Sequence, residues 1–77
     1  MNKARRKRLE DVISQLRDMY DELTSLQEEE QEAADNMPEN LQESDRYYTM
    51  CEIADDFEEA ANDLDDILDR LDETLSK

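Results

Sequence analysis

Apolar residues recur along this 77-residue chain at steps of three and four, and this spacing constrains its fold most strongly. Such steps bring side chains onto one face of an α-helix, whereas in a strand they would scatter across both faces. Two series of this kind predict two amphipathic helices. The first is Leu9, Val12, Leu16, Met19, Leu23, Leu26, Ala33 and Met37, interrupted once by Glu30, and the second is Tyr47, Met50, Ala54, Phe57, Ala61, Leu64, Leu68, Leu71 and Leu75.

The first helix is expected to end where the first series ends. Met37 precedes Pro38, the only proline, and the residue before a proline is disfavoured in the helical region. Asn36 can adopt the left-handed conformation that ends many helices. We therefore predict a helix over about 4–35.

The second helix needs an N-cap, and the sequence offers two. Asn40 with Glu43 three residues later is one, and Ser44 alone is the other. With a turn over about 36–44 and a helix over about 45–76, the predicted fold is all-α, a single antiparallel two-helix hairpin.

Antiparallel pairing defines which side chains should meet across the hairpin. Large residues then face small ones in some layers, as close packing requires. The expected pairs are Leu26 with Ala54, Leu23 with Phe57, Leu16 with Leu64, and Leu9 with Leu71.

A third position in each heptad is also apolar. A two-helix seam needs two apolar positions in seven, whereas three in seven is typical of a bundle. We therefore expect the hairpin to dimerise into a four-helix bundle, or to bind another protein through this spare stripe. The expected association stripe is Ile13, Tyr20, Ile53, Ala60 and Ile67, with Ala34 in the same column.

Charge is distributed very unevenly. Residues 3–8 hold five basic side chains and no acid, whereas residues 9–77 hold twenty-four carboxylates against four basic side chains. A field of this kind opposes compaction and governs solubility and the choice of partner. We expect the basic segment to form cross-helix ion pairs with Asp69, Asp72 and Glu73, with a basic docking site as the alternative.

The acids of the second helix follow two exposed rows, with successive members three or four residues apart. This separation, about 5–6 Å along a helix, is not far from the spacing of phosphates in one nucleic-acid strand. Asp outnumbers Glu in these rows although it is the poorer helix former, which indicates a requirement for negative charge; a plain solvated face is the other interpretation. The candidate partner-binding residues are Glu52, Asp55, Asp56, Glu58, Glu59, Asp63, Asp65, Asp66, Asp69 and Asp72.

Several function classes are not expected. The chain has no histidine and one cysteine, Cys51, so a nucleophile would lack its base and an internal disulfide cannot form. It has no glycine for the bend of a Ca²⁺ loop, and its body is too acidic to bind nucleic acid directly. We expect no enzyme activity, no cofactor and no metal site.

No membrane association is expected either. No apolar run approaches the roughly 20 residues of a membrane span, and the basic start leads into Glu10 and Asp11 rather than into the apolar core of a signal peptide. The expected location is the cytoplasm.

The connecting segment carries a resemblance. Pro38-Glu39-Asn40-Leu41-Gln42-Glu43-Ser44, preceded by Glu-Gln-Glu-Ala at 30–33 and followed by Leu-Asp-Asp and Ile-Leu-Asp units, resembles small acidic helical-hairpin proteins of bacterial prophages and other mobile elements. The resemblance covers nearly the whole chain, although Tyr47-Tyr48 departs from it, and brings no established activity. It implies a bacterial host cell, in which short acidic proteins often inhibit nucleic-acid-binding defence proteins, some by imitating DNA.

Two classes of function follow. The first is an inhibitor whose phosphate-like carboxylates occupy the basic surface of a nucleic-acid-binding host protein, with an acidic antitoxin as a variant. The second is a scaffolding coiled-coil module that binds a partner helix through its spare apolar stripe.

Overall fold

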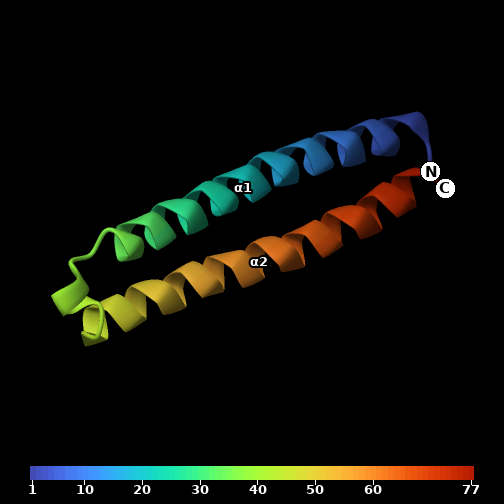
Figure 1. Ribbon diagram of the computed structural model, residues 1–77. Coiled ribbons are helices and arrows are strands. Elements are labelled where there is room, and N and C mark those ends of the chain that lie inside the picture. Colours follow the sequence, from blue (N-terminus) through green and yellow to red (C-terminus); the bar gives the residue numbers. More distant parts are fainter.

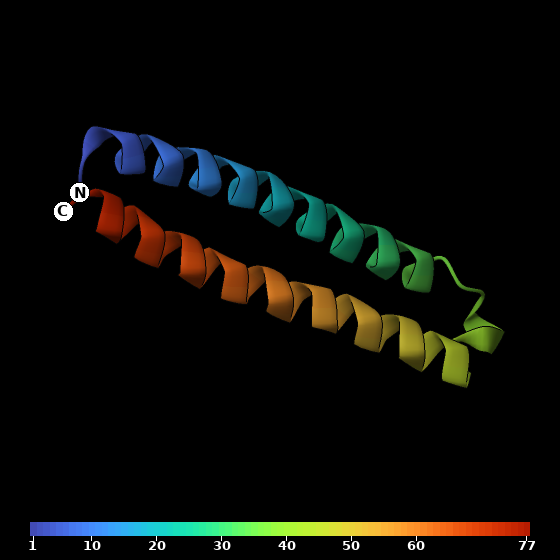
Figure 2. The ribbon, with the colours of Figure 1, turned by 180° about the vertical axis from the view of Figure 1, so that it is seen from behind.

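The computed structural model describes residues 1–77 and confirms an all-α helical hairpin (Figure 1). Helix α1 spans Lys3–Asp35 and helix α2 spans Asp45–Leu75. A single 3-10 turn, η1 (Glu39–Leu41), lies in the connection. The two helices run side by side along their whole length, and both termini lie at the open end in either view (Figures 1 and 2).

Each helix begins at a side-chain cap. The Oδ1 atom of Asn2 accepts a hydrogen bond from the backbone N–H of Arg5 at 2.8 Å, and Ser44 Oγ accepts one from Tyr47 N–H at 3.3 Å. Ser44, and not Asn40, is therefore the N-cap of α2. The Ser44 hydroxyl also donates to the Leu41 carbonyl at 2.6 Å, which ties the cap to η1.

The expectation of a left-handed residue at the end of α1 is wrong. Asn36 has φ −82° and ψ −3°, in the right-handed region, and no residue of the chain has a positive φ. The helix ends because Met37 precedes Pro38 and is displaced from helical geometry. The Gln42 side-chain amide then donates to the Met37 carbonyl at 3.1 Å and supports the turn.

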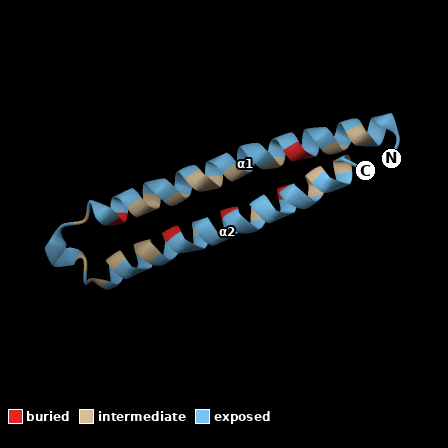
Figure 3. Ribbon diagram, turned by 45° about the vertical axis from the view of Figure 1, so that its right-hand side comes forward, coloured by how far each residue is buried: buried red, intermediate tan, exposed pale blue.

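The helices pack along a seam in which five side chains are buried (Figure 3). Three of the five are alanines, and small side chains allow two helices to approach closely. On α2, every member of the expected apolar series is buried or half-buried. The buried residues are Ile13, Ala34, Ala54, Ala61 and Leu68.

On α1 the seam differs from the expected series. Ile13 is 6% exposed and Tyr20 is half-buried, whereas Met19 is 56% exposed and Leu26 39%. The expectation that Ile13 and Tyr20 lie on a spare stripe is therefore wrong. The column of Leu9, Leu16 and Leu23 has an apolar column on each side, one with Ile13 and one with Met19. In this structure α1 is rotated so that the Ile13 column faces α2.

Contacts at the two ends hold the helices together. The connection joins Asp35 to Asp45, and at the open end the Arg6 guanidinium donates to the Leu75 carbonyl. Between these ends, the buried side chains of the seam are Ile13 and Ala34 on α1 and Ala54, Ala61 and Leu68 on α2.

The open end of the hairpin combines two helix ends of opposite dipole. The last turn of α2 has no basic residue of its own, and Arg6 of α1 supplies one by bonding the Leu75 carbonyl. α2 thus receives from α1 the positive charge that its macrodipole favours, whereas the first turn of α1 has no acid and forms no ion pair with α2.

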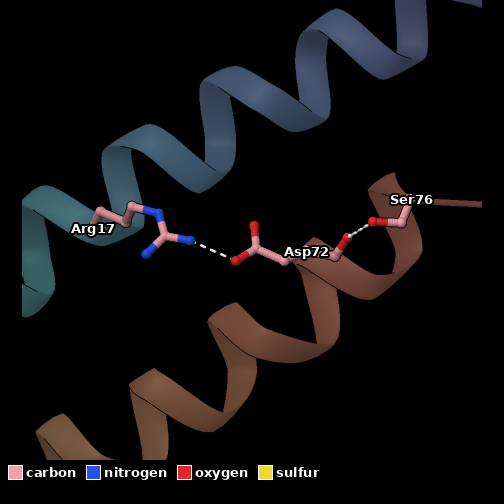
Figure 4. A network of polar contacts seen from close by, with 3 residues as sticks. All are labelled: Arg17, Asp72 and Ser76. Atoms are coloured by element: carbon pink, nitrogen blue, oxygen red, sulfur yellow. Dashed lines mark hydrogen bonds and ion pairs between the residues drawn. The ribbon is translucent and has the colours of Figure 1, made fainter.

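The structure contains two ion pairs. Arg17 contacts Asp72 across the seam at 2.5 Å, beside a hydrogen bond from Ser76 Oγ to the Asp72 carbonyl (Figure 4), and Lys7 contacts Asp11 within α1 at 3.1 Å. The expected pairing of residues 3–8 with the acids of α2 is therefore wrong. Lys7 instead pairs with Asp11, one turn away on the same helix, and Asp72 pairs with Arg17.

The hairpin is long and thin, with extents of 60 × 15 × 13 Å and a radius of gyration of 17.5 Å. A compact chain of this length would have a radius of gyration of about 11–12 Å. Its accessible surface of 5974 Å² also exceeds the roughly 4,900 Å² of a compact protein of this mass. A single copy therefore leaves much surface available to a partner.

Replacing Leu68 with Ala should lower the free energy of unfolding by about 2–4 kcal/mol, because the seam cannot close over the lost volume. The same change at Leu41, which is exposed in the connection, should cost about 1 kcal/mol or less. Urea unfolding followed by circular dichroism measures both. Equal effects at the two sites would contradict the seam described here.

Salt should raise the melting temperature. The chain has twenty-four carboxylates but only two ion pairs, so repulsion between carboxylates dominates its electrostatics. About 0.1 M NaCl screens this repulsion beyond about 10 Å. We expect a rise of several degrees between low and high NaCl, and a larger rise in Arg17→Gln, which has lost its favourable pair. A falling curve for the native chain would show that attraction outweighs repulsion.

Candidate interaction surfaces

The structure offers surfaces rather than an enclosed site. No pocket is found, and nowhere do three or more carboxylate or thiol groups gather closely enough to hold a metal ion. Neither helix has a stretch long and apolar enough to cross a membrane. The chemistry of the chain is therefore displayed on the outside of the two helices.

The acidic rows of α2 lie on its outer surface. Nine of the ten candidate residues are exposed and one, Asp72, is half-buried. Asp72 is also the only one in an ion pair, so the other nine face solvent without a basic partner. We use the name acidic rows for Glu52, Asp55, Asp56, Glu58, Glu59, Asp63, Asp65, Asp66, Asp69 and Asp72.

The helix geometry holds these carboxylates in an ordered array. Steps of three or four residues correspond to about 4.5–6 Å of rise, and α2 continues without interruption from Asp45 to Leu75. Like charges at such spacing repel one another. They also produce a continuous negative potential that a cationic surface would relieve.

A second surface is apolar and runs along one side of the hairpin. Seven-residue repeats place its residues in one column on each helix, next to the seam. We name these residues, all of them exposed, the apolar face: Val12, Met19, Leu26, Ile53, Ala60 and Ile67.

The two columns of the apolar face share one side of the molecule. Arg17 and Asp72 occupy the columns on the opposite flank of each seam, and their ion pair shows that those two flanks face the same way. The remaining flanks, which carry the apolar face, must then face the other way together. Leu16 and Leu64, half-buried at the edge of the seam, extend this surface inward.

Sequence reasoning found half of this face and missed the other half. Ile53, Ala60 and Ile67 were expected on a spare stripe and are exposed, whereas on α1 the exposed column is the neighbouring one. The periodicity gave no signal for this choice, because the columns of Ile13 and Met19 flank the same column of Leu9, Leu16 and Leu23.

The basic tip, residues 3–8, is mostly exposed. Only Arg6 is half-buried, where it bonds the Leu75 carbonyl, and Lys7 pairs with Asp11. The side chains of Lys3, Arg5 and Arg8 form no ion pair. The tip therefore keeps positive charge for an external contact. At the other end, Glu30 is half-buried and does not pair with Arg46.

Cys51 lies one turn from Tyr47 on α2. A hydrogen bond between their side chains, together with the Coulombic effect of the thiol, raises the pKa of the Tyr47 hydroxyl, and burial, Asp35 and Tyr48 add to the shift. All the groups that shift this pKa by charge are acidic. A nucleophilic thiol needs a basic or cationic neighbour instead, so this pair gives no support to catalysis.

Comparison with protein-family models, with curated proteins and with solved structures found no match to this chain.

Proposed function

We propose that this chain is a non-enzymatic acidic interaction protein that binds the basic surface of a nucleic-acid-binding protein and blocks it. The observation that carries the proposal is the array of nine acidic-row carboxylates that face solvent without a basic partner. Retaining so much repulsion costs stability, and a cationic partner would relieve it. The resemblance to prophage and mobile-element hairpins adds a bacterial cytoplasm and a host defence protein as the setting.

Binding would depend on charge in a defined way. Rows of carboxylates along a rigid helix present charge in register with side chains that normally contact phosphates, so affinity should fall with salt. Nucleic acid should compete for the same surface. An antitoxin that masks a basic toxin would use the same rows.

A scaffolding role is the second candidate, and the apolar face favours it. Six exposed apolar side chains on one side of the hairpin can bind a partner helix. In that case the charge serves solubility. We also propose that the chain functions as a homodimer, which would cover the apolar face while leaving most of the acidic rows free.

Neutralising part of the acidic rows should weaken partner binding. Changing Asp55, Asp65 and Asp69 to Asn removes three charges while leaving the Arg17–Asp72 pair intact. We expect much less partner in a pull-down from bacterial lysate, a flatter salt dependence, and displacement of the native complex by added DNA.

The matched control removes three charges from exposed positions on α1, in Asp18→Asn, Asp21→Asn and Glu28→Gln. It should retain most of the binding, because net charge alone is not the determinant. If the α2 variant binds as well as the native chain, and Ile53→Glu abolishes binding without loss of helicity, the scaffolding function replaces this proposal.

A further inference from the structure

The apolar face is symmetric about the middle of the hairpin. On each helix it consists of a central residue, Met19 or Ala60, with one branched aliphatic residue seven positions to either side, and Ala33 continues the α1 column. Met19 is the middle residue of α1 and Ala60 that of α2. A surface of this symmetry can pack on a second copy turned by 180° about a two-fold axis through its middle.

The size of the face suits a stable dimer. The hairpin is 60 Å long and 15 Å wide, so one side covers on the order of 900 Å², close to the roughly 800 Å² per partner of a standard interface. The half-buried leucines at the seam edge would be covered at the same time. Two stacked hairpins form a four-helix bundle with the wider apolar stripe that such bundles require.

Two face-to-face arrangements satisfy the apolar contacts, and charge distinguishes them. With the tips together, α1 of each copy would lie over α2 of the other, and the basic segments 3–8 of both copies would gather at one end of the dimer, where residues 69–77 offer only three acids against two basic side chains. The turn ends would also meet, and residues 28–45 carry eight carboxylates and no basic side chain. Net charge of one sign gathered at each end of the dimer disfavours that arrangement.

Reversing one copy replaces both repulsions with attraction. We propose that two copies of this chain pack through their apolar faces in opposite directions, so that the basic tip of each lies against the acidic turn end of the other. This inference rests on the homodimer of the proposed function and specifies its geometry. Arg8, in the column beside the apolar face, then lies about level with Glu29 of the second copy.

The same arrangement explains why the basic tip has so few partners within one chain. Lys3, Arg5 and Arg8 form no ion pair in the hairpin and meet acids in the dimer. Most of the acidic rows remain free, because all members except Asp56 and Asp63, which lie in the column beside the apolar face, are on the outer and opposite sides of α2. A reversed dimer thus presents two sets of rows on its outer surfaces.

Spin-label distances test the orientation. In a Cys51→Ser background, a label at Asn40→Cys marks the turn, where the native residue is exposed. Reversed copies should give a label separation of about 60 Å, the length of the hairpin. Copies with tips together should give less than roughly 20 Å, the thickness of two helix layers. Mixing with Lys77→Cys should add a short distance only in the reversed dimer.

The control is Met19→Glu with Ile67→Glu, which places charge in the apolar face and should give a helical monomer with no intermolecular distance. Replacing Arg5 or Arg8 with Gln should weaken the dimer by roughly two- to fivefold each. A short Asn40 separation, or a native mass of 9.1 kDa at micromolar concentration, would overturn the inference. If the native chain gives either result and still binds its basic partner through the acidic rows, the proposed function stands without this dimer.

Discussion

α1 and α2 can lie side by side over their whole length because small side chains alternate with larger ones along the seam. Ala34, Ala54 and Ala61 are buried, and larger half-buried residues such as Tyr20 and Phe57 lie in the same seam. This contact sets the rotation of each helix about its axis. The rotation in turn decides which columns meet solvent, so the positions of the apolar face and the acidic rows both depend on it.

The seam is also narrow, and this limits what the hairpin can do alone. Five buried side chains must offset the repulsion of a chain with net charge −15, and the two ion pairs are exposed enough to contribute little. A further stabilising contact lies at the open end, where the Arg6 guanidinium donates a hydrogen bond to the last carbonyl of α2. A partner that covers apolar surface or neutralises acids would therefore add stability as well as function.

The physical division of the surface separates the two proposed contacts. The apolar face lies on the side away from the Arg17–Asp72 pair, and the acidic rows, apart from Asp56 and Asp63 beside the apolar face, occupy the outside of α2 and the side of that pair. Self-association and binding to a basic protein would thus use different surfaces. A substitution at Ile67 in the apolar face can therefore be tested without altering Asp65 in the acidic rows, and the reverse also holds.

The sequence by itself determined the hairpin, because helical periodicity, a single proline and an N-cap serine act through local geometry. It also determined that the acids of α2 form rows, since their spacing is a property of the helix. Only the tertiary structure decided which flank of α1 is buried. Two apolar columns, one with Ile13 and one with Met19, were equally compatible with the helix, and only packing against α2 decided that the Ile13 column is buried. The partner of Asp72 was decided in the same way, because reach across the seam depends on helix rotation.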